Sequence, residues 1–445
     1  MSRKLITLFA ILCVTLSSAA FAGLQNIKVS GDITSQAIAR DFGSDATASS
    51  YGEDSAYLLT QVRLRFDADL AEQVSATVAL INERVWGSNG YSSSETDKND
   101  IELDLAYVTL KQAFYDQLTL IVGRQNLYYG TGMIVGAPAT NQTGDDYLYG
   151  DLSLSNGFDA VRAIIDLAPY TIDLVYAKVT EGSAYNSDDD VTLYGVNAAY
   201  DWSSYNGLTE AYFFAADNAR VYNSGTLIDS TQSNTYVLGA RTQFNPTDKT
   251  TLGIEGAWQF GDAYITGSVD TYRYAMAGNA FAQYRMLDKY NTTFGLCYAY
   301  FSGDDDLSDG RYSAWDPMFE SQSPAEIMNL LVAQSGVQSL TASASFMPKE
   351  DITIKGSYTY AMLTYDYYSS TFTPDYGPAK NHSYSVNTDN WQLGSEVDAA
   401  ILYDYTEDVQ MSLNGAVFIP GNFFDGANDG DSTMYSLRGG ITVSF

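Results

Sequence analysis

Apolar and polar side chains alternate with a period of two residues along most of this chain. Counting back in twos from Phe445 gives Val443, Ile441, Gly439 and Leu437, while polar or small residues occupy the positions between them. This alternation predicts a strand with one apolar face and one polar face. Either a packed partner or lipid must cover the apolar face.

The same alternation recurs in about 18 segments, an even number, as bacterial outer-membrane barrels require. The segments are predicted near residues 25–40, 57–70, 73–85, 101–113, 118–129, 157–167, 170–180, 191–202, 208–216, 235–244, 250–260, 270–286, 291–301, 336–347, 351–365, 391–405, 409–420 and 433–445.

The connections between these segments fall into two classes. Short ones such as "AEQ", "AP", "PKED" and "TED" alternate with long ones over residues 41–55, 87–100, 303–335 and 366–390. Short periplasmic turns on one rim and long extracellular loops on the other are typical of outer-membrane barrels. A soluble Tyr-rich sandwich, the alternative all-β fold, has no reason to alternate in this way. We therefore expect an all-β fold, a single antiparallel up-and-down transmembrane β-barrel surrounded by membrane lipid.

The first 22 residues differ from the rest of the chain. Arg3 and Lys4 precede an apolar run that starts at Leu5, and "AFA" over residues 20–22 is a small-x-small cleavage site. These features predict a signal peptide over residues 1–22 and a barrel over residues 23–445. No later segment approaches the roughly 18 uncharged apolar residues of a membrane helix, so strands must span the bilayer. The expected location is the outer membrane of a Gram-negative type envelope.

Aromatic residues lie near the ends of the predicted strands. The chain contains 36 Tyr, and pairs such as Tyr272 with Tyr274 and Tyr358 with Tyr360 fall on the outward register, where interfacial girdles occur. Phe445 is the last residue of the predicted strand over residues 433–445 and lies on its outward face. A terminal aromatic on such a strand resembles the signal recognised by the outer-membrane assembly machinery, so that machinery is an expected partner.

The inward-facing register carries charge. In "LLTQVRLRFDADL" the apolar residues point outward, which leaves Arg63, Arg65, Asp67 and Asp69 inside. A barrel of about 18 strands is wide enough to leave an aqueous channel. The same count places further charges in the lumen: Arg162, Arg241, Arg273, Arg285, Lys355, Arg438, Glu102, Asp104, Glu255, Glu396 and Asp398.

Two interpretations of this lining compete. The charges can pair across neighbouring strands and brace the wall, or the rigid arginine forks, which match carboxylates, can form a ladder for a small or polymeric anionic solute. Most basic residues lie inside while the acids fill the loops, which favours an anion-selective channel. A general or sugar-type porin, and a barrel serving as an adhesin, a scaffold or a sheath for a partner protein, are the alternatives. The net charge of −31 argues against a nucleic-acid partner.

The acidic loops are candidate calcium sites. In "GDDDLSD" the closely spaced carboxylates of Asp304, Asp305, Asp306 and Asp309 offer the oxygen ligands that Ca²⁺ prefers, although the spacing of an EF-hand is absent. A solvated loop is the alternative. No other metal or cofactor is expected.

A short helix is predicted inside the long extracellular loop over residues 303–335. In "SQSPAEIMNLLVAQSG", Ser323 and Glu326 form a capping box, Pro324 takes the first helical position and Gly336 follows the end. This helix either plugs the mouth of the barrel or shields it. Residues 130–155 are the other candidate for a constriction.

Nothing in the sequence favours an enzyme. The one histidine, His382, lies in a predicted loop, so a Ser-His-Asp arrangement would depend on a poorly placed residue. The segment "YGTGMIVG" lacks the Gly-x-Gly-x-x-Gly spacing of a nucleotide loop. After the signal peptide only Cys297 remains, which leaves no disulfide framework.

Three short segments resemble a known family. "VGRQNLYYGTG" at residues 122–132, "GFDAVRA" at 157–163 and "WDPMFE" at 315–320 resemble, in order and spacing, segments of the alginate-export family of outer-membrane porins. The resemblance implies a barrel of about 18 strands with an arginine-lined pore that passes or exports polyuronate. It also implies that Arg124 and Arg162 line the pore. Strand alternation places Arg124 on the same side as Val122, which requires a bulge or a rim position.

Overall fold

The computed structural model describes most of the chain outside the N-terminus and parts of the long loops. The described residues are 26–43, 55–87, 101–136, 152–181, 190–218, 222–223, 226–227, 233–263, 271–306, 308–322, 325–367, 369, 371–372, 384–426 and 432–445. The predicted signal peptide over residues 1–22, the capping residues Ser323 and Pro324, and His382 lie outside them.

Within these residues the chain forms a closed antiparallel barrel of 18 strands. The strands are β1 (Asn26–Asp41), β2 (Ser55–Ala71), β3 (Val74–Val85), β4 (Glu102–Leu110), β5 (Leu118–Asn126), β6 (Gly157–Leu167), β7 (Tyr170–Thr180), β8 (Val191–Trp202), β9 (Gly207–Asn218), β12 (Ser233–Thr247), β13 (Thr250–Ala263), β14 (Thr271–Arg285), β15 (Thr293–Phe301), β17 (Val337–Lys349), β18 (Ile352–Leu363), β21 (Gln392–Asp404), β22 (Val409–Pro420) and β23 (Met434–Ser444).

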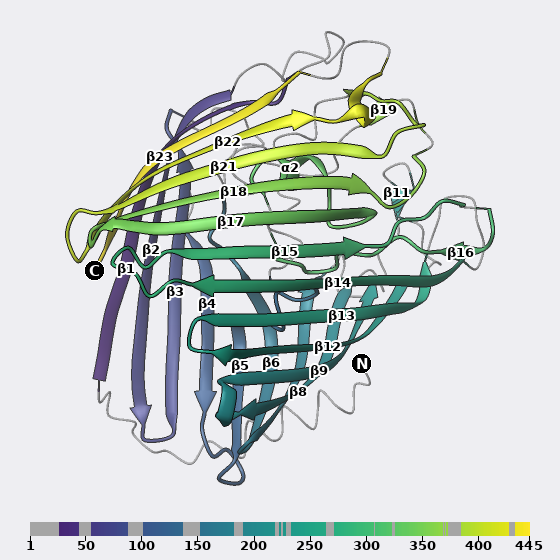
Figure 1. The fold of residues 1–445 in the computed structure, drawn as a ribbon. Helices are drawn as coiled ribbons and strands as arrows, with labels where there is room; N and C mark the ends of the chain where they lie inside the picture. Colours follow the sequence, from purple (N-terminus) through teal and green to yellow (C-terminus); the bar gives the residue numbers. More distant parts are fainter. Residues whose placement is uncertain are drawn as a thin grey trace.

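Each of these strands overlaps one predicted segment, so the predicted fold is confirmed. Each strand pairs antiparallel with its neighbour along the chain, and β23 returns to pair with β1. Figure 1 shows the strands side by side around the barrel, from purple β1 to yellow β23. Closure satisfies the backbone hydrogen bonds of both outermost strands, as a lipid-spanning sheet requires.

Small elements lie in the connections. They are β10 (Tyr222–Asn223), β11 (Thr226–Leu227), β16 (Arg311–Tyr312), β19 (Thr371–Phe372), β20 (Tyr384–Ser385), the single-turn helix α2 (Met328–Leu331) and the 3-10 turns η2 (Ser203–Tyr205) and η4 (Asn422–Phe424). We call the rim that carries the tight turns the short-turn end and the opposite rim the long-loop end.

The two faces of the wall differ as predicted. Large apolar side chains such as Ile27, Leu238 and Ile254 point outward and are more than half exposed, at 52%, 54% and 57%. The outward aromatics cluster toward both rims. Near the long-loop end Tyr272 is exposed, and near the short-turn end the rings of Tyr170 and Tyr200 lie 5.0 Å apart. Such bands match the positions where amphipathic rings favour a membrane interface.

Within the described residues, no helix is both long enough and apolar enough to cross a membrane.

The closing strand pair depends on a glycine. Gly31 of β1 exchanges two backbone hydrogen bonds with Phe445, at 2.9 and 3.0 Å. A Cβ atom added to Gly31 would overlap the carbonyl oxygen of Arg63 and lie 3.0 Å from the ring of Phe445. The glycine therefore lets the aromatic ring of Phe445 cover the outer face of β1.

We predict that Gly31→Ala weakens closure of the barrel by about 1–3 kcal/mol, the usual cost of overpacking a tight site. Gly256→Ala is the matched control, because a Cβ atom at Gly256 of β13 would meet no atom within 4 Å. Urea titration of the refolded protein, followed by its heat-dependent shift in gel mobility, measures the effect. Equal midpoints for the two variants would contradict the role assigned to Gly31.

Candidate functional site

Two long connections fold into the lumen instead of covering its mouth. Residues 127–136, after β5, and the described part of residues 302–336, between β15 and β17, meet through a parallel bridge between Val135 and Phe319. Gly136 N donates to Phe319 O at 2.7 Å, and Phe319 N donates to Ile134 O at 3.1 Å. We call these two segments together the plug.

The plug has an apolar core of its own. Met133, Ile134, Trp315 and Phe319 are buried together with α2 in one cluster. Inward-facing wall residues complete the cluster, and they come from the parts of their strands nearest the long-loop end: Phe158, Val175, Leu193, Phe214, Val237, Ala277 and Leu363. The plug therefore occupies the long-loop half of the lumen. Both predicted candidates for a constriction contribute described residues to it, and residues 137–151 of the second candidate lie outside the described part of the chain.

Glu255 of β13 fixes the first segment of the plug to the wall. Its carboxylate accepts the backbone N–H of Thr131 at 2.8 Å and the hydroxyl of Tyr212 at 2.7 Å. Thr131 Oγ1 in turn accepts the side-chain amides of Asn279 and Gln322, at 3.0 and 2.8 Å. A single wall carboxylate thus organises the turn at Thr131, where Gly130 and Gly132 have positive φ.

Glu396 of β21 fixes the second segment. It is fully buried and accepts the backbone N–H groups of Ile327 and Met328, at 2.6 and 2.7 Å. These groups begin α2 and would otherwise be unpaired. Figure 1 shows α2 behind the wall formed by β18 and β21.

The observed helix differs from the predicted one in start and capping. It spans Met328–Leu331, whereas the sequence pattern placed its start at Pro324. The carboxylate of Glu326 binds Arg438 of β23 at 2.7 Å and accepts the hydroxyl of Ser436, and its predicted capping partner Ser323 lies outside the described residues. The wall therefore supplies a cation for this carboxylate and an acceptor, Glu396, for the helix start.

A third anchor lies at Asp316. Gln259 of β13 exchanges two hydrogen bonds with the backbone of Asp316, at 2.7 and 2.8 Å. The side chain of Asp316 accepts from Thr235 at 3.1 Å and forms an ion pair with Arg273 at 3.4 Å. Arg273 therefore holds the plug and is itself almost fully buried.

Most predicted lumen cations are paired with carboxylates. Besides Arg273 and Arg438, which bind the plug, four arginines pair on the wall below it. These pairs are Arg63 with Asp32 at 3.0 Å, Arg65 with Asp67 at 2.8 Å, Arg162 with Asp173 and Arg241 with Glu210 at 2.9 Å. These contacts agree with the first interpretation of the lining, in which its charges pair with one another and brace the wall.

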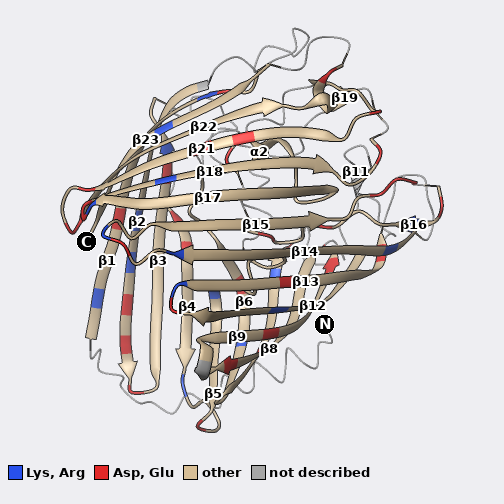
Figure 2. Cartoon of the chain, in the orientation of Figure 1, with Lys and Arg blue, Asp and Glu red and all other residues tan. Residues whose placement is uncertain are grey.

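Two of the predicted cations are placed differently. Arg285 and Lys355 are exposed on the inward register, and the described residues provide neither with an ion-pair partner. Figure 2 shows a blue segment on β18 and a red one on the neighbouring strand β21, while β15 and β17 on the other side are almost entirely tan. Asp398 of β21 lines the same part of the wall as Lys355, but the two side chains form no ion pair.

Strand register connects these cations into one row. Successive cross-strand partners run Arg285, Thr293, Ser345, Lys355, Ala400, Asn414 and Arg438. Arg285, Lys355 and Arg438 are separated by three strands each, or about 14 Å at the usual strand spacing. Arg285 ends β14 at the short-turn rim, and Arg438 binds the plug. The cation row therefore rises along the inner wall from the rim to the plug.

Arg124, Glu102 and Asp104 have other positions. Arg124 pairs in register with Ala106 and Asp159 on the outward side of the wall and forms an ion pair with Asp159 at 3.5 Å. A pore-lining role, which the family resemblance implied, does not fit this register. Glu102 begins β4 and is exposed, whereas Asp104 is buried and its backbone oxygen accepts Arg124 Nε at 3.2 Å.

The acidic loop residues bind their own backbone. Asp304 accepts Ser313 N at 2.6 Å, Asp306 accepts Ser308 N at 3.0 Å and Asp309 accepts Arg311 N at 2.7 Å. Among the described residues, no group of three or more His, Cys, Asp or Glu side chains is arranged to hold a metal ion. The predicted calcium site at Asp304, Asp305, Asp306 and Asp309 stays a hypothesis.

Sequence reasoning missed several residues that carry these contacts. Asp316 and Glu210 are among them, because alternation alone does not predict which arginine each carboxylate contacts. A further set of hydroxyls faces the lumen from β17 and β18, namely Ser339, Thr341, Ser343, Ser345 and Ser357. The signal for the first four was present, because "SLTASAS" alternates small hydroxyl residues with other residues.

The comparisons with known proteins agree with this architecture. A family model described as "Alginate export" matches residues 35–437. Among solved structures, Pseudomonas aeruginosa OccK11 (OpdR) is similar with a TM-score of 0.56 at 12% identity, covering 95% of this chain and 96% of that one. P. aeruginosa OpdQ gives a TM-score of 0.55 at 14% identity, covering 95% and 99%.

P. aeruginosa OccK2 (OpdF), solved in complex with glucuronate, gives a TM-score of 0.55 at 11% identity, covering 95% of this chain and 98% of that one. At these identities the likeness concerns the fold. No curated protein matches the sequence. Family match and fold together place the chain in the outer membrane as a barrel of the porin type, and indicate a channel rather than an enzyme.

We predict that Glu396→Ala loosens the plug, because the two N–H groups at the start of α2 lose their acceptor at a cost of about 1–3 kcal/mol each. Limited proteolysis of the folded barrel should then cut residues 302–336 faster. Glu407→Ala, in an exposed turn between β21 and β22, is the control. Unchanged proteolysis in Glu396→Ala would show that the apolar core alone holds the plug.

A pH dependence follows from Glu320, which lies in the plug outside the strands. Burial raises the pKa of its carboxyl to about 7, against the opposing hydrogen bond from Gln322 N. Since the folded pKa exceeds the ordinary value of 4.5, the protonated form is favoured in the folded state. The plug is therefore most stable at low pH and loses this contribution as the pH rises through about 7.

We expect proteolysis of the plug to accelerate between about pH 4.5 and about pH 7, after correction for the protease's own pH profile. In Glu320→Gln the acceleration should be reduced, because the amide does not ionise. Identical pH profiles for the wild type and Glu320→Gln would contradict the assignment to Glu320.

Proposed function

Because the chain belongs to the alginate export family, we propose that it passes a hydrophilic, anionic, polyuronate-like solute through its lumen along cations of the inner wall. The observation that carries this proposal is the cation row of Arg285, Lys355 and Arg438. An inclined row of charge on one side of a water-filled pore attracts anions along its whole length.

The chemistry of the row suits carboxylates. Guanidinium groups bind carboxylates with two parallel hydrogen bonds, and an ammonium group binds them as a point charge. Arg438 already holds the carboxylate of Glu326 at 2.7 Å. A solute carboxylate that moves along the row therefore meets Arg285 and Lys355 first and then competes with Glu326 for Arg438.

The fold relative OccK2 contains glucuronate, a single uronate, in its solved complex. This supports the solute class proposed here, since a barrel of the same fold accommodates such a molecule. The arginines that pair on the wall, such as Arg65, Arg162 and Arg241, complete the proposed lining. Each guanidinium group can bind its wall carboxylate and a carboxylate of the passing solute at the same time.

One observation favours a second candidate, a sugar-type porin. The wall of β15 and β17 presents Thr293, Ser343 and Ser345 to the lumen, and four arginines below the plug are neutralised by carboxylates. Such a lining also suits a neutral sugar. Ion selectivity separates the two candidates, because the sugar-type porin requires no preference for anions.

The first test is the reversal potential of the refolded barrel in a planar bilayer under a KCl gradient. We expect a preference for chloride that falls in the double variant Arg285→Gln/Lys355→Gln, by about twofold for each removed charge, since a unit charge contributes roughly 0.5 kcal/mol across a pore radius of water. Lys111→Gln/Lys289→Gln, which removes two exposed charges from turns at the same rim, is the control.

Cation preference in the wild type, or equal selectivity in the two double variants, would overturn the anionic-solute proposal. Absence of conductance under conditions that open the plug would favour a scaffold or sheath. Arg65, Arg162 and Arg241 are poorer targets, because removing each one exposes a carboxylate, and the loss of a cation is then mixed with the gain of an anion.

A further inference from the structure

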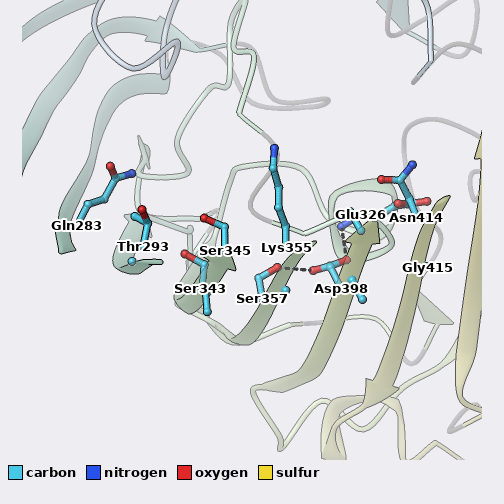
Figure 3. A pocket seen from close by; sticks show the side chains of 15 residues that line it. Gln283, Thr293, Glu326, Ser343, Ser345, Lys355, Ser357, Asp398, Asn414 and Gly415 are labelled. Atoms are coloured by element: carbon cyan, nitrogen blue, oxygen red, sulfur yellow. Dashed lines mark hydrogen bonds between the residues drawn. The ribbon is translucent and has the colours of Figure 1, made fainter. Parts of the chain in front are cut away.

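A cavity of about 350 Å³ lies on the inner wall between β14 and β22, below the plug. Its volume falls within the roughly 300–1,000 Å³ typical of small-molecule sites. Figure 3 shows its side chains projecting from neighbouring strands, with Lys355 between a group of hydroxyls on one side and Asp398 and Asn414 on the other.

The cavity exists because the wall is thin there. Gly295 and Ala400 lie on the inward register among the lining residues and project little or nothing into the lumen. A larger side chain at either position would enter the recess, so its depth is encoded in the sequence.

Hydroxyl and amide groups surround this recess. Thr293, Ser343, Ser345, Ser357 and Asn414 all contribute to its lining. Ser343 pairs in register with both Gly295 and Ser357, and Ser345 pairs with both Thr293 and Lys355. The hydroxyls therefore form two adjacent rows on three neighbouring strands. Each of these hydroxyls can both donate and accept a hydrogen bond, as the hydroxyl groups of a sugar can.

Lys355 gives the recess one cationic position. Its ammonium group is exposed to the lumen, and the described residues offer it no ion-pair partner. Figure 3 shows the side chain extended away from the wall. An ammonium group in this position has three donors available for a solute carboxylate.

The remaining charges of the cavity restrict the kind of anion. Asp398 lines the recess and accepts the hydroxyl of Ser357 at 3.2 Å, and Glu326 borders it while bound to Arg438. Asp398 repels a small inorganic anion bound at Lys355. A sugar acid offsets this repulsion, because with its carboxylate on Lys355 it can direct hydroxyl donors toward Asp398.

We propose that this cavity binds one uronate unit, with the carboxylate on Lys355 and the ring hydroxyls on Ser343, Ser345 and Asp398. This deepens the proposed function and rests on it, since the site lies midway along the cation row. The unit is either a free monosaccharide or one residue of an oligomer, and both present the same groups. The site adds specificity to a pore whose row of charge attracts anions generally.

The test is calorimetric titration of the full chain in detergent with glucuronate. Glucose, which has the ring hydroxyls without the carboxylate, and acetate, which has the carboxylate without the ring, are the comparison ligands. We expect glucuronate to bind at least about tenfold more tightly than either, and Lys355→Gln to weaken glucuronate binding by about tenfold, the usual effect of losing one charge-assisted hydrogen bond. A trimer of linked uronates, titrated in the same way, separates the oligomer from the monosaccharide.

Two further variants complete the design. Lys289→Gln is the matched control, because Lys289 lies in a turn at the short-turn end with its ammonium 4.6 Å from the ring of Tyr290. It should bind glucuronate as the wild type does. Ser343→Ala/Ser345→Ala should weaken the binding of glucuronate and glucose and leave that of acetate unchanged. Heat-dependent gel mobility verifies that every variant is folded.

Equal glucuronate binding by Lys355→Gln and the wild type would overturn the site, as would acetate binding as tightly as glucuronate. The bilayer measurement keeps this failure separate from failure of the proposed function. Chloride preference with binding that does not depend on Lys355 removes only the cavity. Lys355-dependent binding in a barrel without anion preference supports the cavity and removes only the anionic channel.

Discussion

The backbone of the inward-folded segments needs hydrogen-bond acceptors inside the barrel, and carboxylates on the wall supply them. Buried N–H groups without partners are costly. Glu255 meets this need at Thr131 and Glu396 meets it at the start of α2. These contacts explain why acidic residues project into a lumen whose neighbouring positions are apolar. They also place the plug against the top of the cation row, where Arg438 holds Glu326. The plug lies where the wall supplies acceptors for its N–H groups, and these positions determine which part of the lumen stays open.

Much of the barrel is predictable from the sequence, because a period of two residues fixes which side chains face lipid and which face the lumen. The inward positions of Arg241, Lys355 and Glu396 follow from counting alone. Their partners do not, because pairing between strands depends on register and on irregularities such as the shift between Ala79 and Leu80. The start of α2 was missed for a related reason. Its acceptor, Glu396, lies far away along the chain, whereas the capping box is a local pattern.

The lumen separates charge into two kinds. Arginines such as Arg63 and Arg241 have carboxylate neighbours, and these pairs give the wall rigidity with little net charge. Lys355 and Arg285 form no ion pair with a described carboxylate, although Asp398 lines the same recess as Lys355. A cation without an ion-pair partner is free to bind a solute, whereas a paired arginine is largely neutralised. The chain carries a net charge of −31, and these two cations are the groups of the described lumen best placed to attract an anion.

The bridge between Val135 and Phe319 joins segments that follow β5 and β15. Glu255 holds the first of these segments at Thr131, and Glu396 holds the second at Ile327 and Met328. The bridge couples the two anchors, because neither segment can leave the wall without breaking its contact with the other. The two segments therefore respond as one unit to the loss of either carboxylate.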